Sequence, residues 1–318
     1  MARHKSTPRA SEQRHSPTGE APAKRSGKRP PSSRSNRSSP NRPTAPDTRG
    51  KTARDSGSRG KGGHEPVWLW GGHAVLAALA NPNRRCRRVL VAEESQDHWH
   101  SKLAPLLAAR EDLPPEPEVR PRKAFDRLLP ESVVHQGLAL LAEPLDQPDL
   151  DVLLTLLPED RPVAIVLLDQ ISDPQNAGAV LRSAAAFGAS AVVTTRRNAP
   201  AETGSLAKAA SGALEHVPFL HLPNLARAME RMQEAGLRVL GLAEEGSELL
   251  QEAAESQRVA IVLGAEGSGL RRLTRERCDA LVRLPTQGEI AALNVSNAAA
   301  VALYEVLGRR AARSRTSS

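Results

Sequence analysis

Three short segments of the 318-residue chain combine glycines with a few polar side chains, each directly after an apolar run. In the first, Asn176, Gly178 and Arg182 follow a run that ends at Asp169. An amide and a guanidinium can hold ribose hydroxyls or phosphates. A cation gains nothing from the helix dipole near a helix start. Arg182 is therefore a candidate phosphate or ribose ligand, and the alternative is an ordinary surface arginine.

The second segment places Gly264, Gly267 and Gly269 around one carboxylate, Glu266, after a fully apolar run. It matches neither the dinucleotide fingerprint nor a Walker loop, because the Lys-Ser/Thr ending is missing. Glycines at these positions would let backbone amides approach a ligand closely. By itself the segment is compatible with any tight turn from a strand into a helix.

In the third segment, a run that ends at Leu284 is followed by a loop with Pro285 and Gly288. A helix rich in small residues then opens with the sequence NVSNAAA, which starts at Asn294. Its alanines and asparagines predict very close packing against another backbone. An ordinary buried helix is the alternative for this segment.

The elements that must position these segments alternate regularly from Arg161 onward. Expected strands are Val163–Leu168, Ala191–Thr194, His216–Leu220, Arg238–Leu242, Arg258–Leu263 and Ala280–Leu284. Expected helices are Asn176–Phe187, with Asn176 as its N-cap, Ser205–Ala213, Leu225–Glu234, Gly269–Glu276 and Val295–Arg309. Such alternation predicts an α/β fold with a largely parallel sheet covered on both faces. Ligands bind such sheets at the carboxyl ends of the strands, where all three segments lie.

Upstream, residues 66–143 predict a separate small α/β domain, joined by a linker, residues 144–160, with one or two helical turns. Its expected helices are His73–Ala80, His98–Ala109 and Arg122–Leu129, and its expected strands are Arg88–Ala92, a segment near Val119, and Leu138–Ala142. Trp68, Trp70 and Phe125 could stack on bases. Core packing is the favoured interpretation of these three aromatic side chains.

Residues 1–65 differ in composition from the rest of the chain. They contain 16 Lys and Arg against 5 Asp and Glu, whereas residues 66–318 contain 28 against 31. The segment has no aromatic residue and is rich in Ser, Pro and Gly, so we expect a disordered basic arm. Such an arm attracts polyanions such as RNA, and a solubilising tail is the alternative. Its many prolines and its lack of an amphipathic apolar face disfavour an organellar transit peptide.

Only two cysteines occur, Cys86 and Cys278, and neither belongs to a CxxC pair. We therefore expect neither a disulfide framework nor a structural zinc site, and no metal. No apolar run reaches the ~18–20 residues of a membrane span. A cytoplasmic protein without a membrane partner is therefore expected.

Together, in this order and spacing, the three segments resemble the signature motifs of the SpoU branch of the knotted (SPOUT) methyltransferases. The matching positions are Asn176, Gly178, Arg182, Phe187 and Gly188, then Gly264, Glu266 and Gly269, then Pro285, Gly288, Leu293, Asn294, Val295 and Ser296. The resemblance covers residues 161–310. Upstream, Gly71, Gly72 and His135–Leu140 resemble the small substrate-binding domain of the RlmB subgroup.

The resemblance implies a trefoil-knotted methyltransferase domain at residues 161–312, followed by a tail, 313–318. It also implies a homodimer whose active site is completed across the interface. The implied reaction is methyl transfer from S-adenosylmethionine to the ribose 2′-OH of a guanosine in 23S ribosomal RNA. The implied cofactor-binding residues are Leu263, Gly264, Leu284, Pro285, Leu293 and Ser296.

The implied catalytic residues are Arg182, Asn176, Glu266 and Asn294. A guanidinium normally stays protonated at neutral pH, so Arg182 is interpreted as holding a target phosphate and favouring deprotonation of the hydroxyl electrostatically. Asn176 and Asn294 would orient the ribose or Arg182, and Glu266 would position Arg182 through a charged hydrogen bond. The family commonly has Ser where this chain has Ala292. Either the hydroxyl is dispensable here, or Ser296 or a water replaces it, or activity is lowered; the first two are favoured because every other motif position is intact.

Two other functions remain open from the residues. One is a transfer-RNA 2′-O-methyltransferase of the same family. The other is a non-catalytic RNA-binding assembly factor, in which Ala292 marks lost chemistry and the basic arm binds RNA. Absence of methyl transfer would identify the binding factor, and the class of RNA that is methylated separates the two enzymes.

Overall fold

Two β-sheets organise the chain in the computed structural model, which describes residues 65–197, 199–288 and 293–309. The first sheet has four strands in the order β1-β4-β2-β3. Its strands are β1 (Val67–Trp70), β2 (Cys86–Ala92), β3 (Glu118–Arg120) and β4 (Leu138–Ala142). Strand β4 pairs antiparallel with both β1 and β2, and β2 pairs parallel with β3. We call this sheet with its helices, residues 67–142, the four-stranded module.

The helices of the four-stranded module are α1 (Gly72–Ala80), α2 (Gln96–Ala108) and α3 (Arg122–Leu128), and a 3-10 turn, η1 (Glu93–Ser95), precedes α2. Phe125 and Trp70 are buried in its core. Trp68 is half-buried, with the Arg88 guanidinium 5.8 Å from its ring centroid. Core packing, rather than base stacking, is therefore confirmed for Phe125 and Trp70.

The second sheet has seven strands in the order β7-β6-β5-β10-β8-β11-β9. All neighbouring strands are parallel, which confirms the predicted parallel sheet. The strands are β5 (Val163–Asp169), β6 (Ala191–Thr195), β7 (Phe219–Leu222), β8 (Arg238–Leu242), β9 (Glu248–Leu249), β10 (Arg258–Gly264) and β11 (Ala280–Arg283). We call this sheet with its helices, the described residues between 150 and 309, the seven-stranded module.

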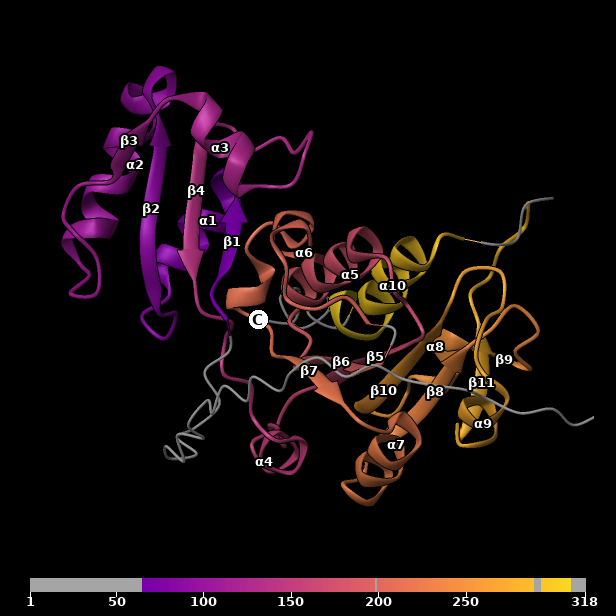
Figure 1. The fold of residues 1–318 in the computed structure, drawn as a ribbon. Helices are drawn as coiled ribbons and strands as arrows, with labels where there is room; N and C mark the ends of the chain where they lie inside the picture. The colour runs from indigo at the N-terminus through magenta and orange to yellow at the C-terminus, as the bar shows by residue number, and fades with distance from the viewer. Residues whose placement is uncertain (1–64, 198, 289–292, 310–318) are drawn as a thin grey trace, which may run out of the picture. The chain divides into compact units, whose positions relative to one another are not determined.

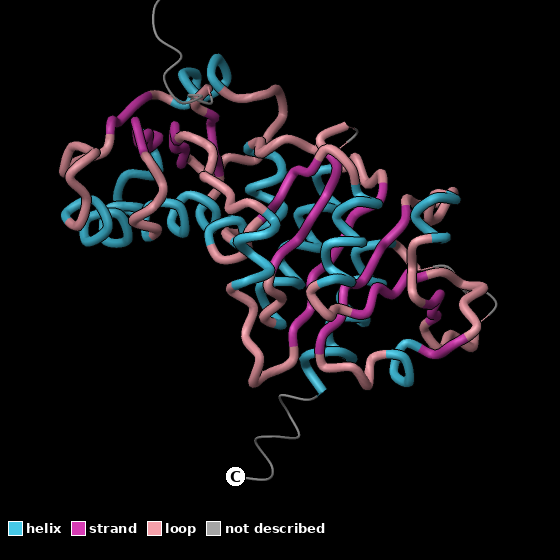
Figure 2. The backbone as a smooth tube through the Cα atoms, turned by 90° about the horizontal axis from the view of Figure 1, so that it is seen from below, coloured by secondary structure: helices cyan, strands magenta, loops and turns pink. Residues whose placement is uncertain are grey.

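Helices cover both faces of the larger sheet. They are α4 (Leu150–Thr155), α5 (Pro174–Phe187), α6 (Gly204–Ala210), α7 (Leu225–Glu234), α8 (Leu250–Ala253), α9 (Arg272–Glu276) and α10 (Val295–Leu303), with a 3-10 turn, η2 (Ala213–Glu215), and a π-helical turn, η3 (Tyr304–Gly308). Helices α5, α6 and α10 lie on one face, and α4 and α7 lie on the other (Figure 1). Figure 2 shows the strands running side by side between these helices.

Strand β5 shows why the sheet reads as continuous apolar runs. Alternate residues Ala164, Val166 and Leu168 join the core under α5, α6 and α10, whereas Ile165 and Leu167 join the core under α4 and α7. All of β5 is buried, including its last residue, Asp169. A strand covered on both faces needs apolar residues at every position, so helical or alternating periodicity is absent.

The predicted N-cap of the first long helix is wrong. Helix α5 begins at Pro174, and the Asp173 carboxylate caps it by accepting a hydrogen bond from the backbone N–H of Gln175 (3.0 Å). Proline suits the first helical position because its missing N–H would have no helical partner there. Asn176 therefore lies inside the first turn, where its amide is free for other contacts.

Two other predicted helices are shorter in the structure. The helix expected at 269–276 begins at Arg272, because Gly269 adopts a positive φ of 63° in the preceding loop. The helix expected at 205–213 ends at Ala210, because Ser211 turns into the left-handed region and a 3-10 turn follows. The last helix runs as predicted from Val295, but its final turns are π-helical.

Strand boundaries also shift. The strand expected from His216 starts only at Phe219, because Pro218 has no N–H to donate to a neighbouring strand. Strands β1 and β9 and helix α8 were not predicted; β9 has only two residues and carries little pattern. The predicted arm, residues 1–64 of it, and the tail lie outside the described residues, as does Ala292. No helix in the described ranges has the length and apolar character that crossing a membrane requires.

Candidate active site

A cavity of about 910 Å³ opens at the carboxyl edge of the larger sheet. Strands β5, β10, β8 and β11 are parallel neighbours, so their carboxyl ends meet there, with Gly264 opposite Asp169 in the register. The lining comes from the segments after β8, β10 and β11, and from the start of α10: Leu242–Glu245, Leu263–Leu270, Arg275, Arg283–Thr286, Leu293–Val295 and Ala298. This is the edge at which open α/β sheets bind ligands.

Five of the six predicted cofactor-binding residues line this cavity: Leu263, Gly264, Leu284, Pro285 and Leu293. Ser296 lies outside the lining. Its backbone N–H and its hydroxyl both donate to Asn294 Oδ1, at 2.9 and 2.6 Å, at the start of α10. In this structure Ser296 shapes the helix start rather than the cavity wall.

The floor of the cavity is a loop that folds back on its own backbone. A Cβ on Gly264 would lie 2.2 Å from the carbonyl carbon of Gly269, so only glycine fits there. The N–H of Gly269 donates to the carbonyl of Ala265 (2.8 Å), which closes the loop. Glycine is required here as predicted, but the group that approaches Gly264 closely is the backbone of the same loop rather than a ligand.

A buried carboxylate that was not predicted as a site residue holds the far end of this loop. Asp169 is fully buried at the end of β5 and accepts hydrogen bonds from Arg271 Nε (2.6 Å) and the Arg271 backbone N–H (3.0 Å). An ionised group is buried only when paired and hydrogen-bonded. The available sequence signal was a lone acidic residue ending an otherwise apolar strand.

Three of the predicted catalytic residues meet beside the cavity. Glu266 Oε1 accepts hydrogen bonds from Asn176 Nδ2 (3.1 Å) and from Asn294 Nδ2 (2.5 Å). Asn294 Nδ2 also donates to Asn176 Oδ1 (3.1 Å). The three side chains come from α5, from the loop after β10 and from the start of α10. Residues 90 and 118 positions apart in sequence thus form one hydrogen-bonded cluster.

Arg182 stands apart from this cluster. It is exposed on α5 and makes no ion pair or hydrogen bond with any residue in the described ranges. The predicted charged hydrogen bond from Arg182 to Glu266 is absent, and Glu266 Oε1 instead accepts hydrogen bonds from the two asparagines. The Arg182 guanidinium therefore has no partner among the described residues.

The cavity is bordered by the carboxylates Glu244, Glu245 and Glu266 and by the guanidiniums Arg275 and Arg283. Arg275 pairs with Glu245, and Arg283 Nη1 donates to the carbonyl of Gly246 (2.6 Å). The backbone N–H of Glu245 and the guanidinium of Arg275 lower the pKa of the Glu245 carboxyl. Both cations are thus engaged, while the carboxylates of Glu244 and Glu266 are exposed.

Two family models match the chain. The SpoU rRNA Methylase family matches residues 163–304, and the model for RNA 2′-O ribose methyltransferase substrate binding matches residues 68–148. A Coxiella burnetii protein named 23S rRNA (guanosine-2′-O-)-methyltransferase RlmB is 38% identical over 245 residues, covering 77% of this chain and 96% of its own. The chain belongs to the SpoU rRNA methylase family. The predicted resemblance is confirmed.

Other relatives of this SpoU family member agree. The Escherichia coli K12 protein of the same name is 36% identical over 245 residues, covering 76% of this chain and 98% of its own. A solved RNA 2′-O ribose methyltransferase has 26% identity and a TM-score of 0.61, covering 78% of this chain and 90% of its own. AviRb from Streptomyces viridochromogenes, solved in complex with AdoMet, has 23% identity and a TM-score of 0.64, covering 77% and 90%. The AviRb likeness shows the shared fold.

The cavity of this SpoU family member fits the cofactor that the family uses. Its volume lies within the range of about 300–1,000 Å³ that is usual for small-molecule sites. Leu242, Leu263, Leu284 and Leu293 offer apolar surface for an adenosine, and the exposed carboxylates of the lining suit the positively charged sulfonium and ammonium groups of S-adenosylmethionine. Within the described residues, no group of three or more His, Cys, Asp or Glu side chains is arranged to hold a metal ion.

Proposed function

We propose that the protein transfers a methyl group from S-adenosylmethionine to the ribose 2′-OH of a guanosine in 23S ribosomal RNA. The observation that carries the proposal is the Asn176–Glu266–Asn294 cluster beside a cofactor-sized cavity. Relatives bearing the corresponding name support the substrate, since they match over nearly their whole length. The match to a substrate-binding family model supports RNA contact by the four-stranded module.

The cofactor would lie among Leu263, Gly264, Leu284, Pro285 and Leu293, where backbone and leucine side chains line the cavity. When bound, it supplies a methyl group already activated by its sulfonium. The protein must therefore align the hydroxyl with that methyl group and favour loss of the hydroxyl proton to water. Glu266 and the two asparagines border the position where alignment is needed.

Glu266 holds both amide groups by accepting from each Nδ2. This leaves the amides in one orientation, so that their remaining capacity can bind ribose hydroxyls without reorganisation. Arg182, exposed and without a described partner, would hold a phosphate of the target RNA. Its positive charge would favour deprotonation of the 2′-OH at the moment of attack.

A two-fold dimer would bring Arg182 to the cavity of the partner. In support, Arg182 is not among the residues lining the cavity of its own chain. Val301 and Tyr304 are 44% and 51% exposed on α10 and η3, which pack beside α5 and offer an apolar surface for a second copy. Dimerisation through this surface would cover both side chains.

The remaining predictions stay part of this proposal. A trefoil knot is supported by the insertion of β10 between β5 and β8, two strands that precede it in the chain. A disordered, RNA-attracting arm at residues 1–65 is supported by its charge and composition. A cytoplasmic location is supported by two free cysteines.

The first test is methyl transfer from labelled S-adenosylmethionine to total RNA from cells that lack the corresponding methylation. The modified nucleotide is mapped by mass spectrometry. We expect 2′-O-methylguanosine in 23S ribosomal RNA. Label in transfer RNA would keep the chemistry and overturn the substrate. No label in any under-modified RNA, from a folded and cofactor-binding protein, would overturn the enzymatic proposal and favour the RNA-binding factor.

The contribution of the arm is tested by removing residues 1–65 and measuring RNA affinity across salt concentrations. Cationic contacts release counterions, so the truncated chain should lose affinity most at low salt and show a shallower salt dependence. An unchanged slope would show that the arm is only a solubilising tail.

A further inference from the structure

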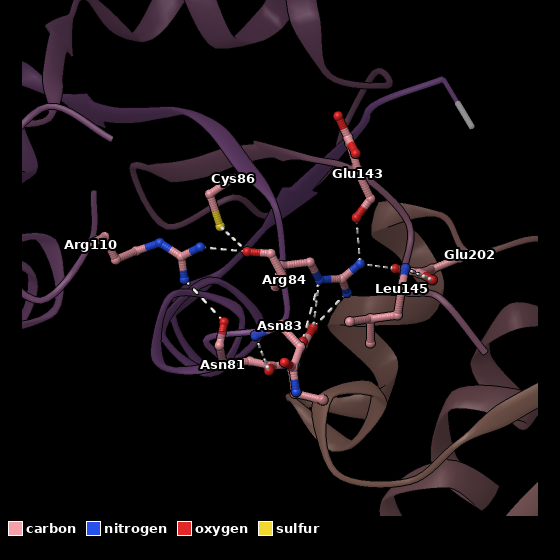
Figure 3. Close-up of polar contacts among 9 residues, drawn as sticks. Asn81, Asn83, Arg84, Cys86, Arg110, Glu143, Leu145 and Glu202 are labelled. Carbon is pink, nitrogen blue, oxygen red and sulfur yellow. Dashed lines mark hydrogen bonds and ion pairs between the residues drawn. The ribbon is translucent and has the colours of Figure 1, made fainter. Parts of the chain in front are cut away.

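A buried polar cluster connects the two modules, which both belong to one compact unit of the chain. Its centre is Arg84, whose side chain is fully buried and lies in the turn between α1 and β2 (Figure 3). Its acidic partners are Glu202, two residues before α6 of the seven-stranded module, and Glu215, the last residue of η2, which follows α6. One residue of the four-stranded module thus contacts the chain on both sides of α6.

Each polar atom of this cluster has a partner. Arg84 Nη2 and Nε donate to Glu215 Oε1 at 2.5 and 3.2 Å, and Nη1 donates to Glu202 and to the carbonyl of Glu143. Asn81 Nδ2 donates to Glu215 Oε2 (2.7 Å), and the N–H of Leu145 donates to Glu202 Oε2 (3.2 Å). Burial by itself lowers the pKa of Arg84, but the two carboxylates raise it more, so the guanidinium stays charged.

A second arginine holds the turn from the opposite side. Arg110 Nη1 donates to the carbonyls of Leu79 and Asn81 at 3.0 and 3.1 Å, and Nη2 donates to Asp112. Asp112 Oδ2 in turn accepts from the backbone N–H of Cys86 (2.9 Å). Arg84 is therefore held in place by contacts inside the four-stranded module. Its ion pairs then fix the positions of Glu202 and Glu215 relative to that module.

Helix α6 continues this contact toward the proposed active site. A Cβ on Gly204 would lie 1.9 Å from the Trp70 ring, so the first turn of α6 rests directly on β1. On its other side, a Cβ on Gly178 would lie 2.4 Å from Cβ of Ala209, so α6 and α5 touch with no room for larger residues. Helix α5 carries Asn176 and Arg182.

We propose that Arg84, with Glu202 and Glu215, is a positioning group that sets where RNA held by the four-stranded module meets Asn176 and Arg182. This inference rests on the proposed function. Arg84 is fully buried and therefore touches no RNA itself; it acts through α6, which is packed between β1 and α5. Charged hydrogen bonds are directional, so they specify one docking geometry where apolar contacts alone would permit sliding.

The experiment compares the full wild-type chain with the triple variant Arg84→Met, Glu202→Gln, Glu215→Gln. Removing all three charges leaves no unpaired buried ion, so the variant should fold. We expect the single-turnover rate at saturating 23S RNA to fall by about tenfold or more, because misplacing reactants is costly. Cofactor affinity should stay unchanged. Hydrogen exchange should rise at Val67–Trp70 and at the first turn of α6.

The matched control is Arg231→Met with Asp151→Asn, which removes an exposed ion pair on α7 and α4. It should leave rate and exchange unchanged. Arg84→Lys, with charge but without the forked geometry, should recover part of the rate. A merely structural role would lower the amount of active protein and leave the rate per active site unchanged. That result, or wild-type exchange in the triple variant, would overturn the inference.

Failure of the proposed function gives a different outcome. If the wild-type chain methylates no RNA, the function is lost while the exchange comparison still reports whether the cluster holds α6 against β1. If the wild type is active and the triple variant matches its rate, the positioning role fails while the enzyme assignment stands.

Discussion

The two polar clusters of this protein differ in how completely they are satisfied. Around Arg84, a buried guanidinium is surrounded by two carboxylates, an amide and backbone groups. Around Glu266, the carboxylate and Asn294 are exposed, and Arg182 has no partner among the described residues. The first cluster has no capacity left for a ligand. The second keeps donors and acceptors open beside a cavity.

This difference teaches how to separate structural from catalytic polar residues in such a chain. A buried ion must be paired, since an unpaired one costs several kcal/mol, on the order of the net stability of a domain. A catalytic group gains from staying open until substrate arrives. The role of an arginine in this protein is therefore indicated by how many of its hydrogen-bond donors are already paired, rather than by its residue type.

The largest expected effect is on Arg182. Arg182→Ala should lower the methyl-transfer rate by about 100-fold or more, as expected for loss of an electrostatic contact to developing charge. Folding should be unaffected because the side chain is exposed. Single-turnover kinetics and cofactor titration check this, with Arg227→Ala on α7 as the control. Full activity would remove Arg182 from the mechanism and break the comparison.

At the satisfied cluster, a single substitution should instead destabilise the protein. Arg84→Met leaves Glu202 and Glu215 buried without a cation, so the free energy of unfolding should fall by about 3–5 kcal/mol. Urea denaturation measures this. Arg231→Met, at an exposed pair, should cost less than about 1 kcal/mol. Equal losses in the two variants would mean that burial of Arg84 is not what makes it structural.

The cavity loop should respond with a loss of binding. Gly264→Ala forces a Cβ against the Gly269 backbone and should weaken S-adenosylmethionine binding by about tenfold to a hundredfold, an overpacking penalty of ~1–3 kcal/mol. Isothermal titration measures the affinity. Gly188→Ala is the control, because Gly188 has open space for a Cβ, so alanine there strains only its positive φ of 77° and leaves the cavity loop untouched. It should affect stability only. Unchanged affinity in Gly264→Ala would separate the cavity from the cofactor.

The smallest effect concerns two thiols, of which Cys86 lies beside the satisfied cluster. Burial raises the pKa of Cys86 to about 11 and that of Cys278 to about 12. Both thiols are therefore neutral at pH 8, and native protein should react slowly with iodoacetamide. In the unfolded chain the thiols ionise near pH 9, below the pKa values of the folded state. The free energy of unfolding should therefore fall as pH rises above 9 toward these values.

The alkylation rate of Cys86 tests whether the Arg84 cluster is closed. Its reaction should quicken in Arg84→Met, because the cluster opens, and should stay slow in Arg182→Ala. Mass spectrometry after timed alkylation distinguishes the two cysteines. Fast labelling of Cys86 in the wild-type chain would contradict a closed cluster.

Much of the larger sheet was predictable because its strands are buried on both faces. Val163–Leu168 and Arg258–Leu263 were recognised as apolar runs, and both are strands. Helix starts were less predictable where neighbouring residues could each cap the helix. Asn176 looked like a cap, but Asp173 and Pro174 together define the first turn. Short elements such as Glu248–Leu249 carry too few residues for any periodic signal.

The sequence by itself determined the family, the parallel sheet and the residue types of the site, because motif order and apolar runs are local properties of the chain. Only the tertiary structure decided that Glu266 binds two asparagines instead of Arg182, and that Asp169 anchors the cavity loop. It also decided that Arg84 is buried between carboxylates some 118 and 131 residues away. Such pairings depend on which strand ends and helices meet in space, and no local pattern encodes that meeting.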